Sequence, residues 1–258
     1  MKIVSLLENT ASSEKVKAEH GLSLYIETDC HKILFDMGQS DLFYENALSL
    51  GIDLTLVDIA VLSHGHYDHG GGLGKFLEVN KTAPVYINKN AFEPHYNGTE
   101  KYIGLDKALE NNPRIVFTDN EFSIDKSLTL FTCNERERNF TLLPSGLNTF
   151  ENGEFIPDDF RHEQYLLIEE QNKNILISGC SHKGICDITD WFCADVLIGG
   201  FHLSKYPPDD ELTRIANKLD LSGTQFYTCH CTGIEQYNFM KNHMKKLSYL
   251  SCGETILL

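Results

Sequence analysis

The sequence predicts an α/β fold in which two mixed β-sheets lie between layers of helices, an αββα arrangement. Three observations on the 258-residue chain support it. Short apolar, β-branched runs recur in both halves, stretches with helical spacing separate them, and no Pro- or Ser-rich linker divides the chain. This length suits one large α/β domain or two small ones, and we predict a single domain over residues 1–258.

The first half of the chain is expected to form one sheet with its helices. The expected strands cover residues 3–7, 22–26, 33–35, 58–62 and 85–87. The expected helices cover residues 41–50 and 71–79. Residues 91–112 contain Pro94 and Gly98 and are predicted to be a loop, with a short helix over 104–110. This loop either forms one wall of a substrate pocket or is a surface excursion.

The second half repeats this pattern of strands and helices. The expected strands cover residues 115–117, 128–131, 165–168, 175–177, 196–198 and 255–258. The expected helices cover residues 209–219 and 234–246. Trp191 is expected to pack in the core from a further helix that follows Gly184.

Composition restricts the partners and the compartment. The formal net charge is -15 and no long run of Lys and Arg is present, so we expect no nucleic-acid partner. No stretch approaches the ~20 apolar residues of a membrane span, and the apolar run at the N-terminus is too short for a signal peptide. We therefore predict a cytoplasmic protein that acts on a small molecule, and a homo-oligomer stays open.

The cysteines suggest free thiols or metal ligands. The eight cysteines do not form paired CxxC knuckles, and a reducing compartment disfavours disulfides. Cys229 and Cys231 flank His230 and would point away from it on an extended strand end, so we expect them to pack in the core or behind the metal ligands.

A cluster of metal-binding residue types follows the expected buried strand at 58–62. His64 and His66 are two residues apart, so in extended backbone they point to the same side and can bind one ion. Asp68 and His69 come after a turn and can face a second ion. Three glycines follow, and they allow the chain to pass close to the site. The alternative is a chance grouping on a surface loop, but residue type, spacing and context agree on a metal site.

Further donors occur at the ends of other expected strands. His162 lies just before the strand at 165–168. Cys180, His202 and His230 each follow a strand, and all four donors, His162 included, are expected to form one site at one edge of a sheet. Each of these residues could by itself be a structural one, so the predicted metal site rests on all four together.

These residues together resemble the metallo-β-lactamase superfamily. The resemblance rests on His-x-His-x-Asp-His at 64–69, after an apolar strand, and on Ile-Leu-Phe-Asp-Met-Gly at 33–38, and it covers essentially the whole chain in order. It implies a four-layer αββα metallo-β-lactamase sandwich, with two mixed sheets between helix layers. It also implies a metallo-hydrolase.

The resemblance implies two divalent metal ions. The family pattern assigns to the first ion His64, His66 and His162. It assigns to the second ion Asp68, His69 and His230. Cys180 would take the bridging position, where most hydrolases of the superfamily have Asp, and His182 could serve instead or as well. A thiolate favours zinc, with iron or manganese as alternatives.

Three segments narrow the resemblance further. Gly-Cys-Ser-His-Lys-Gly at 179–184, Gly-Gly-Phe-His-Leu at 199–203 and His-Cys-Thr-Gly at 230–233 are similar to the subgroup named for dihydropterin ribofuranosyl-aminobenzene phosphate synthase. We take this name as a group label. The implied activity is hydrolysis of a small anionic metabolite that resembles a phosphate ester or a pterin.

In that activity two cations would activate a water molecule. Asp68 would orient the water or accept its proton, and Lys183 and His202 would bind a substrate anion or protonate a leaving group. Lys183 could equally be a surface residue. Two other functions stay open, namely an iron-containing redox enzyme on the same fold and a non-catalytic metal-binding sensor.

Overall fold

The computed structural model describes residues 1–140, 142–143 and 145–258. Its internal contacts divide the chain into two compact units. Unit 1 consists of Met1–Asp119, Pro144–Gln164 and Ser251–Leu258. Unit 2 consists of Asn120–Leu143 and Tyr165–Leu250. The sequence-based expectation of a single domain over residues 1–258 stays a prediction.

Unit 1 is built on a seven-stranded mixed sheet with the order β18-β1-β2-β3-β4-β5-β8. Its strands are β1 Lys2–Leu7, β2 Ser23–Glu27, β3 Lys32–Phe35, β4 Ile59–Val61, β5 Val85–Asn88, β8 Ile115–Thr118 and β18 Thr255–Leu257. The pairs from β18 to β3 are antiparallel, and those from β3 to β8 are parallel. The carboxyl ends of β3 and β4 therefore lie at the same edge of the sheet.

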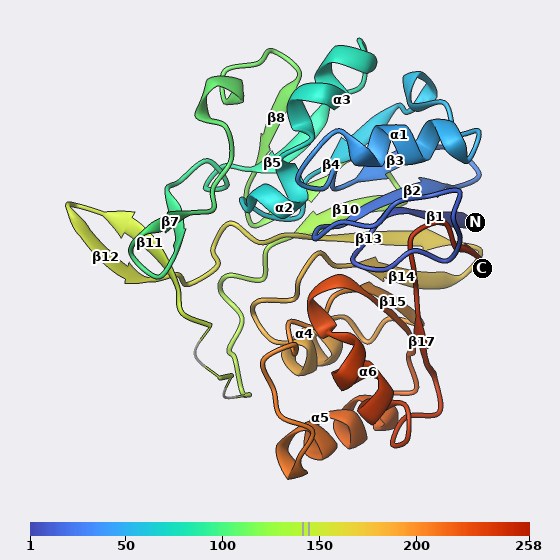
Figure 1. Cartoon of the computed structure of the whole chain (residues 1–258), viewed down its shortest axis with the longest axis vertical. Helices are drawn as coiled ribbons and strands as arrows, with labels where there is room; N and C mark the ends of the chain where they lie inside the picture. Colours follow the sequence, from blue (N-terminus) through green and yellow to red (C-terminus); the bar gives the residue numbers. More distant parts are fainter. Residues whose placement is uncertain (141, 144) are drawn as a thin grey trace. The chain divides into compact units, whose positions relative to one another are not determined.

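Helices on one side of this sheet close the core of unit 1 (Figure 1). They are α1 Leu42–Ser49, α2 Tyr67–Gly70 and α3 Leu73–Val79, with 3-10 turns η1 Leu54–Leu56 and η2 Lys107–Leu109. Phe43 of α1 and Phe76 of α3 are fully buried against Leu34 of β3 and Val85 of β5. Burial of such side chains contributes about 2 kcal/mol each to folding.

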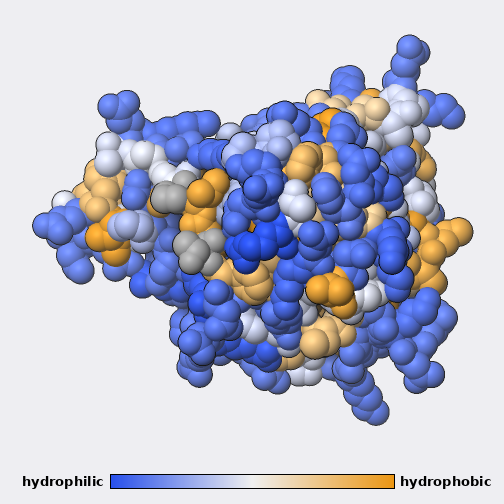
Figure 2. All heavy atoms as spheres, turned by 90° about the horizontal axis from the view of Figure 1, so that it is seen from below, coloured by the Kyte–Doolittle hydropathy of each residue, from blue (hydrophilic) through white to orange (hydrophobic). Residues whose placement is uncertain are grey.

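A second, smaller sheet in unit 1 has the order β12-β11-β6-β7. Its strands are β6 His95–Asn97, β7 Lys101–Tyr102, β11 Leu147–Glu151 and β12 Glu154–Pro157. Phe150 and Phe155 pack against each other with ring centroids 4.8 Å apart and are both partly exposed. Figure 2 shows apolar residues at the left of the view, where β11 and β12 lie. The sheet matters for the site because it carries His95.

Unit 2 is built on a seven-stranded mixed sheet with the order β17-β16-β15-β14-β13-β10-β9. Its strands are β9 Glu121–Ser123, β10 Leu128–Phe131, β13 Tyr165–Glu170, β14 Lys173–Ile177, β15 Val196–Gly199, β16 Gln225–Thr228 and β17 Leu247–Tyr249. Its helices are α4 Ile185–Phe192, α5 Asp210–Leu221 and α6 Ile234–Met240, with a 3-10 turn η3 His230–Thr232. Ile188, Leu212 and Met240 pack from these helices into the core over Leu197 and Phe226.

Most predicted elements are present, and the differences have local causes. The predicted loop at 91–112 contains β6 and β7, which are too short to show an alternating pattern. The helix predicted to reach residue 246 ends at Met240, because Leu247 begins a strand that pairs with Phe226. Trp191 is only partly buried at the edge of the core. Among the described residues no helix is both long and apolar enough to span a bilayer.

Asn80 closes the loop between α3 and β5 from inside the core. Its side-chain amide donates to the carbonyls of Leu54 and Val57 at 3.0 and 2.8 Å. Its side-chain oxygen accepts from the backbone N–H groups of Thr82 and Ala83 at 3.0 and 2.8 Å. A single fully buried amide thus satisfies backbone groups of two chain segments, 54–57 and 82–83.

We expect Asn80→Ala to lower the free energy of unfolding by roughly 2–4 kcal/mol, because it leaves buried donors and acceptors unpaired. Urea unfolding measures the change. Asn238→Ala, at an exposed position of α6, is the matched control and should change the free energy by less than about 0.5 kcal/mol. Equal effects of the two substitutions would contradict this role of Asn80.

Candidate metal centre

The carboxylate of Asp36 organises the metal-binding segment of unit 1. Asp36 follows β3, is fully buried and has a φ of 59°. Its Oδ1 accepts from the backbone N–H of Ser63 at 2.7 Å, and its Oδ2 accepts from the Ser63 hydroxyl at 2.7 Å. The same Oδ2 lies 2.6 Å from Nδ1 of His69. Because β3 and β4 are parallel neighbours, this carboxylate sits beside the start of the motif.

These bonds fix the tautomers of two histidines. A carboxylate only accepts hydrogen bonds, so His69 carries its proton on Nδ1. The single hydroxyl proton of Ser63 is donated to Asp36, so Ser63 Oγ accepts from Nδ1 of His64 at 2.7 Å. In both neutral rings the lone pair is therefore on Nε2. This is the arrangement in which a histidine binds a metal while a carboxylate holds its other nitrogen.

The predicted imidazoles of unit 1 lie together. The ring of His64 is 4.6 Å from that of His66, 4.1 Å from that of His69 and 5.9 Å from that of His162, measured between centroids. Burial, followed by the nearby His162 ring, lowers the pKa of His66 well below its ordinary value. A ring with a low pKa is neutral at pH 7 and keeps its lone pair for a metal.

Asp68 is held at the beginning of α2, next to His69. Its Oδ2 lies 3.1 Å from Nε2 of His20 and 3.8 Å from Nε2 of His69. His20 is about half exposed, whereas Asp68 is mostly buried. The carboxylate thus faces imidazole nitrogens, as a ligand or a proton acceptor would.

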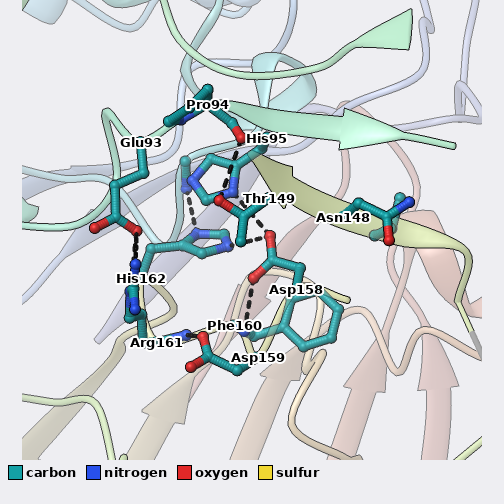
Figure 3. Close-up of polar contacts among 12 residues, drawn as sticks. Glu93, Pro94, His95, Asn148, Thr149, Asp158, Asp159, Phe160, Arg161 and His162 are labelled. Atoms are coloured by element: carbon teal, nitrogen blue, oxygen red, sulfur yellow. Dashed lines mark hydrogen bonds and ion pairs between the residues drawn. The ribbon is translucent and has the colours of Figure 1, made fainter. Parts of the chain in front are cut away.

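Gly65 allows the motif to pass against the loop at Ala91. A Cβ at Gly65 would lie 2.1 Å from the carbonyl oxygen of Ala91, so no other residue fits without moving backbone. The Gly65 N–H donates to Nδ1 of His162 at 2.9 Å, and Nε2 of His162 lies 3.3 Å from Oδ2 of Asp158. Since Nδ1 accepts, the proton of His162 is on Nε2, facing Asp158 (Figure 3).

In unit 2 the predicted donors follow parallel strands. Cys180, His202 and His230 come after β14, β15 and β16, which pair in parallel, so the three residues lie at the same edge of this sheet. Each of the three follows a strand, as the sequence indicated, and their service in one site together with His162 stays a prediction. Gly199 permits the approach of β15 to β14, since a Cβ there would lie 1.9 Å from the carbonyl oxygen of Ser178.

A group of sulfur and nitrogen donors forms at this edge. One ligand atom each of Cys180, His202 and Cys231 lies within 4.8 Å of the others, and the rings of His182 and His202 are 4.3 Å apart. Burial raises the pKa of the Cys231 thiol, but hydrogen bonds with Cys180 and His202 outweigh burial and lower it well below its ordinary value. Sequence reasoning gave Cys231 a packing role and missed this group.

Lys183 is fully buried and is no surface residue. Its Nζ donates to the carbonyl of Thr132 at 2.6 Å and lies 5.7 Å from the centroid of the Tyr165 ring. These contacts anchor the ammonium within unit 2, and the predicted catalytic role of Lys183 stays a prediction. The sequence also predicted one metal centre with ligands from both units, and this stays a prediction. Its predicted ligands are His64, His66, Asp68, His69, His162, Cys180, His182 and His230. The predicted catalytic role of His202 stays a prediction as well.

Comparison with known proteins agrees with this geometry. Residues 16–220 match the family model of the metallo-β-lactamase superfamily. The chain belongs to this superfamily. Its fold is accordingly the metallo-β-lactamase fold, which confirms the predicted α/β class.

Relatives cover the whole chain. An uncharacterized protein of Methanocaldococcus jannaschii is 30% identical, over 94% of this chain and 97% of that protein. The 7,8-dihydropterin-6-methyl-4-(β-D-ribofuranosyl)-aminobenzene-5'-phosphate synthase of the same organism is 29% identical, over 99% and 96%. The solved structure of Tm1679, described as a metal-dependent hydrolase of the β-lactamase superfamily, is 31% identical with a TM-score of 0.84, over 100% and 99%. The resemblance to the synthase subgroup is thus confirmed.

Several residues around this metallo-β-lactamase motif escaped sequence reasoning. Asp36 lay in the quoted segment at 33–38 but received no role, although an acidic residue directly after a buried strand was a signal. His20 and His95 carried no spacing signal. Asp158 was equally hidden, because its partner His95 is 63 residues away in the sequence.

We expect Asp36→Asn to weaken zinc binding by about 10–100-fold, because the amide has one acceptor oxygen and its NH2 group would face either the Ser63 N–H or the His69 N–H. Competition with a chromophoric chelator measures the affinity, and urea unfolding reports whether the variant is folded. Asp58→Asn is the control, since Asp58 also faces a histidine, His31 at 3.4 Å, outside the motif. A folded Asp36→Asn protein with wild-type affinity would disprove the positioning role.

Proposed function

We propose that the chain is a metal-dependent hydrolase with two divalent cations, which acts on a small anionic metabolite that resembles a phosphate ester or a pterin. The observation that carries the proposal is the group of buried imidazoles in unit 1. His64 and His69 hold their protons on Nδ1 toward Ser63 and Asp36 and keep their lone pairs on Nε2. A buried acceptor at Nδ1 holds each ring in this tautomer, which is the one that metal binding through Nε2 needs.

The donor chemistry fits zinc. Neutral imidazoles and thiolates are ligands that zinc prefers, and carboxylates bind it as well. Unit 1 and unit 2 each contain a buried group of donors that could hold an ion, which supports two cations per chain. When bound, a divalent cation lowers the pKa of a water molecule and offsets the negative charge that develops on the substrate.

The residues of unit 1 have distinct parts in this reaction. As the family pattern assigns them, His64 and His66 would hold one cation and His69 would face the other. Asp36 orients His69 directly and His64 through Ser63, so that the site does not reorganise on binding. Asp68 would accept the proton of the attacking water, because its carboxylate is next to the His69 nitrogen and mostly shielded from solvent.

The substrate class rests on the relatives. The synthase relative is named for a product that joins a dihydropterin to a ribofuranosyl aminobenzene phosphate. Such a molecule is planar at one end and anionic at the other. One relative is named a synthase and another a hydrolase, and both have a similar sequence identity to this chain. Experiments must therefore distinguish transfer of a group to water from transfer of the same group to an amine.

We expect His66→Ala to lose metal and to lower kcat/KM by at least about 1000-fold, while the far-UV spectrum stays that of the wild type. Metal analysis of protein purified without added metal gives the content. Turnover is screened on phosphodiesters, thioesters, lactones, and a reduced pterin with a leaving group on its 6-methyl carbon, with and without the aminobenzene ribofuranosyl phosphate. His31→Ala, outside the motif, is the control.

Removal of metal with a chelator should abolish turnover, and zinc should restore it. Retention of metal and full turnover in His66→Ala would refute the site. Turnover that requires the aminobenzene substrate would replace hydrolysis with synthesis at the same site. Two irons with visible absorbance would favour the redox function.

A further inference from the structure

His95 lies beside the motif histidines but belongs to the small sheet of unit 1. It begins β6 and pairs with Thr149 of β11. Its side chain is fully buried, and its Nδ1 lies 2.8 Å from Oδ2 of Asp158 (Figure 3). Its Nε2 has no hydrogen-bond partner among the residues that the structure describes. A buried ring nitrogen without a partner costs free energy and calls for an explanation.

The neighbours of the His95 ring are other metal-binding groups. The ring of His95 is 3.9 Å from that of His162 and 5.6 Å from that of His66, measured between centroids. One ligand atom each of His66, His95, Asp158 and His162 lies within 4.8 Å of the others, and all four residues are buried. The four residues belong to unit 1, so the group is complete within one compact unit.

Asp158 is fixed as a partner for His95. Its Oδ1 accepts from the backbone N–H of Phe160 at 2.7 Å, in a turn where Phe160 has a φ of 60°. The adjacent Arg161 pairs with Glu93 at 2.9 Å and also with Glu151, which ties this turn to the rest of unit 1. Burial alone would raise the pKa of Asp158, but hydrogen bonds from His162 and His95 outweigh it and hold that pKa well below its usual range.

The two histidines that face Asp158 differ in their available lone pairs. His162 accepts from the Gly65 N–H through Nδ1, so its proton is on Nε2 and both of its nitrogens are engaged. His95 donates from Nδ1, so its lone pair is on Nε2, the nitrogen without a partner. In this conformation His95 is the better prepared of the two to bind a cation.

We propose that His95 is a metal ligand of unit 1, through Nε2, and that Asp158 is its positioning residue. The arrangement Asp158–His95 repeats the arrangement Asp36–His69, in which a buried carboxylate also holds Nδ1. A purely structural histidine would have partners for both ring nitrogens. The inference rests on the metal dependence in the function proposed above.

Zinc binding to the full-length protein tests the proposal. His95→Gln keeps an amide donor for Asp158 but removes the imidazole lone pair, and we expect it to weaken zinc affinity by more than about 100-fold. Asp158→Asn, which loosens the ring, should weaken it by about 10–100-fold. His31→Gln is the matched control, a histidine paired with a carboxylate in the same unit, and it should bind zinc as the wild type does.

The cobalt-substituted protein gives a readout that is independent of activity. Each imidazole ligand with an N–H shows one exchangeable, paramagnetically shifted proton resonance, and His95→Gln should lack one of the wild-type set. Wild-type affinity together with an unchanged set of resonances in folded His95→Gln overturns the proposal. If this variant does not fold, Asp158→Asn decides, and wild-type zinc affinity in that variant likewise overturns it.

The two proposals fail separately. If His95→Gln loses zinc but the wild type turns over none of the substrates, the ligand assignment stands and the proposed function falls. If the wild type is a metal-dependent hydrolase and His95→Gln binds zinc normally, the assignment falls and the function stands.

Discussion

A neutral imidazole has one proton and one lone pair, so whatever receives the proton decides where the lone pair points. In unit 1 two buried carboxylates determine the position of the lone pair. Asp36 accepts the hydrogen bond from Nδ1 of His69 and also that from the Ser63 hydroxyl, which leaves Ser63 Oγ to accept from Nδ1 of His64. Asp158 accepts the hydrogen bond from Nδ1 of His95. In the function proposed above, the orientation of the metal ligands of unit 1 depends on these two acidic residues.

The fold places both carboxylates where their burial is compensated. Asp36 directly follows β3, beside the parallel strand β4, so the backbone of Ser63 comes within reach of its Oδ1. Asp158 directly follows β12, and its Oδ1 accepts from the Phe160 N–H. An isolated buried carboxylate is strongly unfavourable, and the backbone donors and imidazoles that surround these two offset this cost. Stability and tautomer control therefore come from the same hydrogen bonds.

The sequence predicted the parts of the site that local spacing encodes. The motif at 64–69 was recognisable because its donors are consecutive on one strand end, and Cys180, His202 and His230 were recognisable because each follows a strand. His95 and Asp158 were not, because only the pairing of β6 with β11 brings them together. Cys231 is buried, as predicted, but the extended strand end expected there is the 3-10 turn His230–Thr232, and the residue lies beside Cys180 and His202.

The tautomers themselves are the most direct test of this account. Long-range proton–nitrogen NMR correlation on the metal-free, nitrogen-15-labelled protein distinguishes a protonated Nδ1 from a protonated Nε2 in each histidine. The account predicts Nδ1–H for His64, His69 and His95, and Nε2–H for His162. Protonated Nε2 in His69 and His95 would mean that their carboxylates do not hold them, and it would contradict the account.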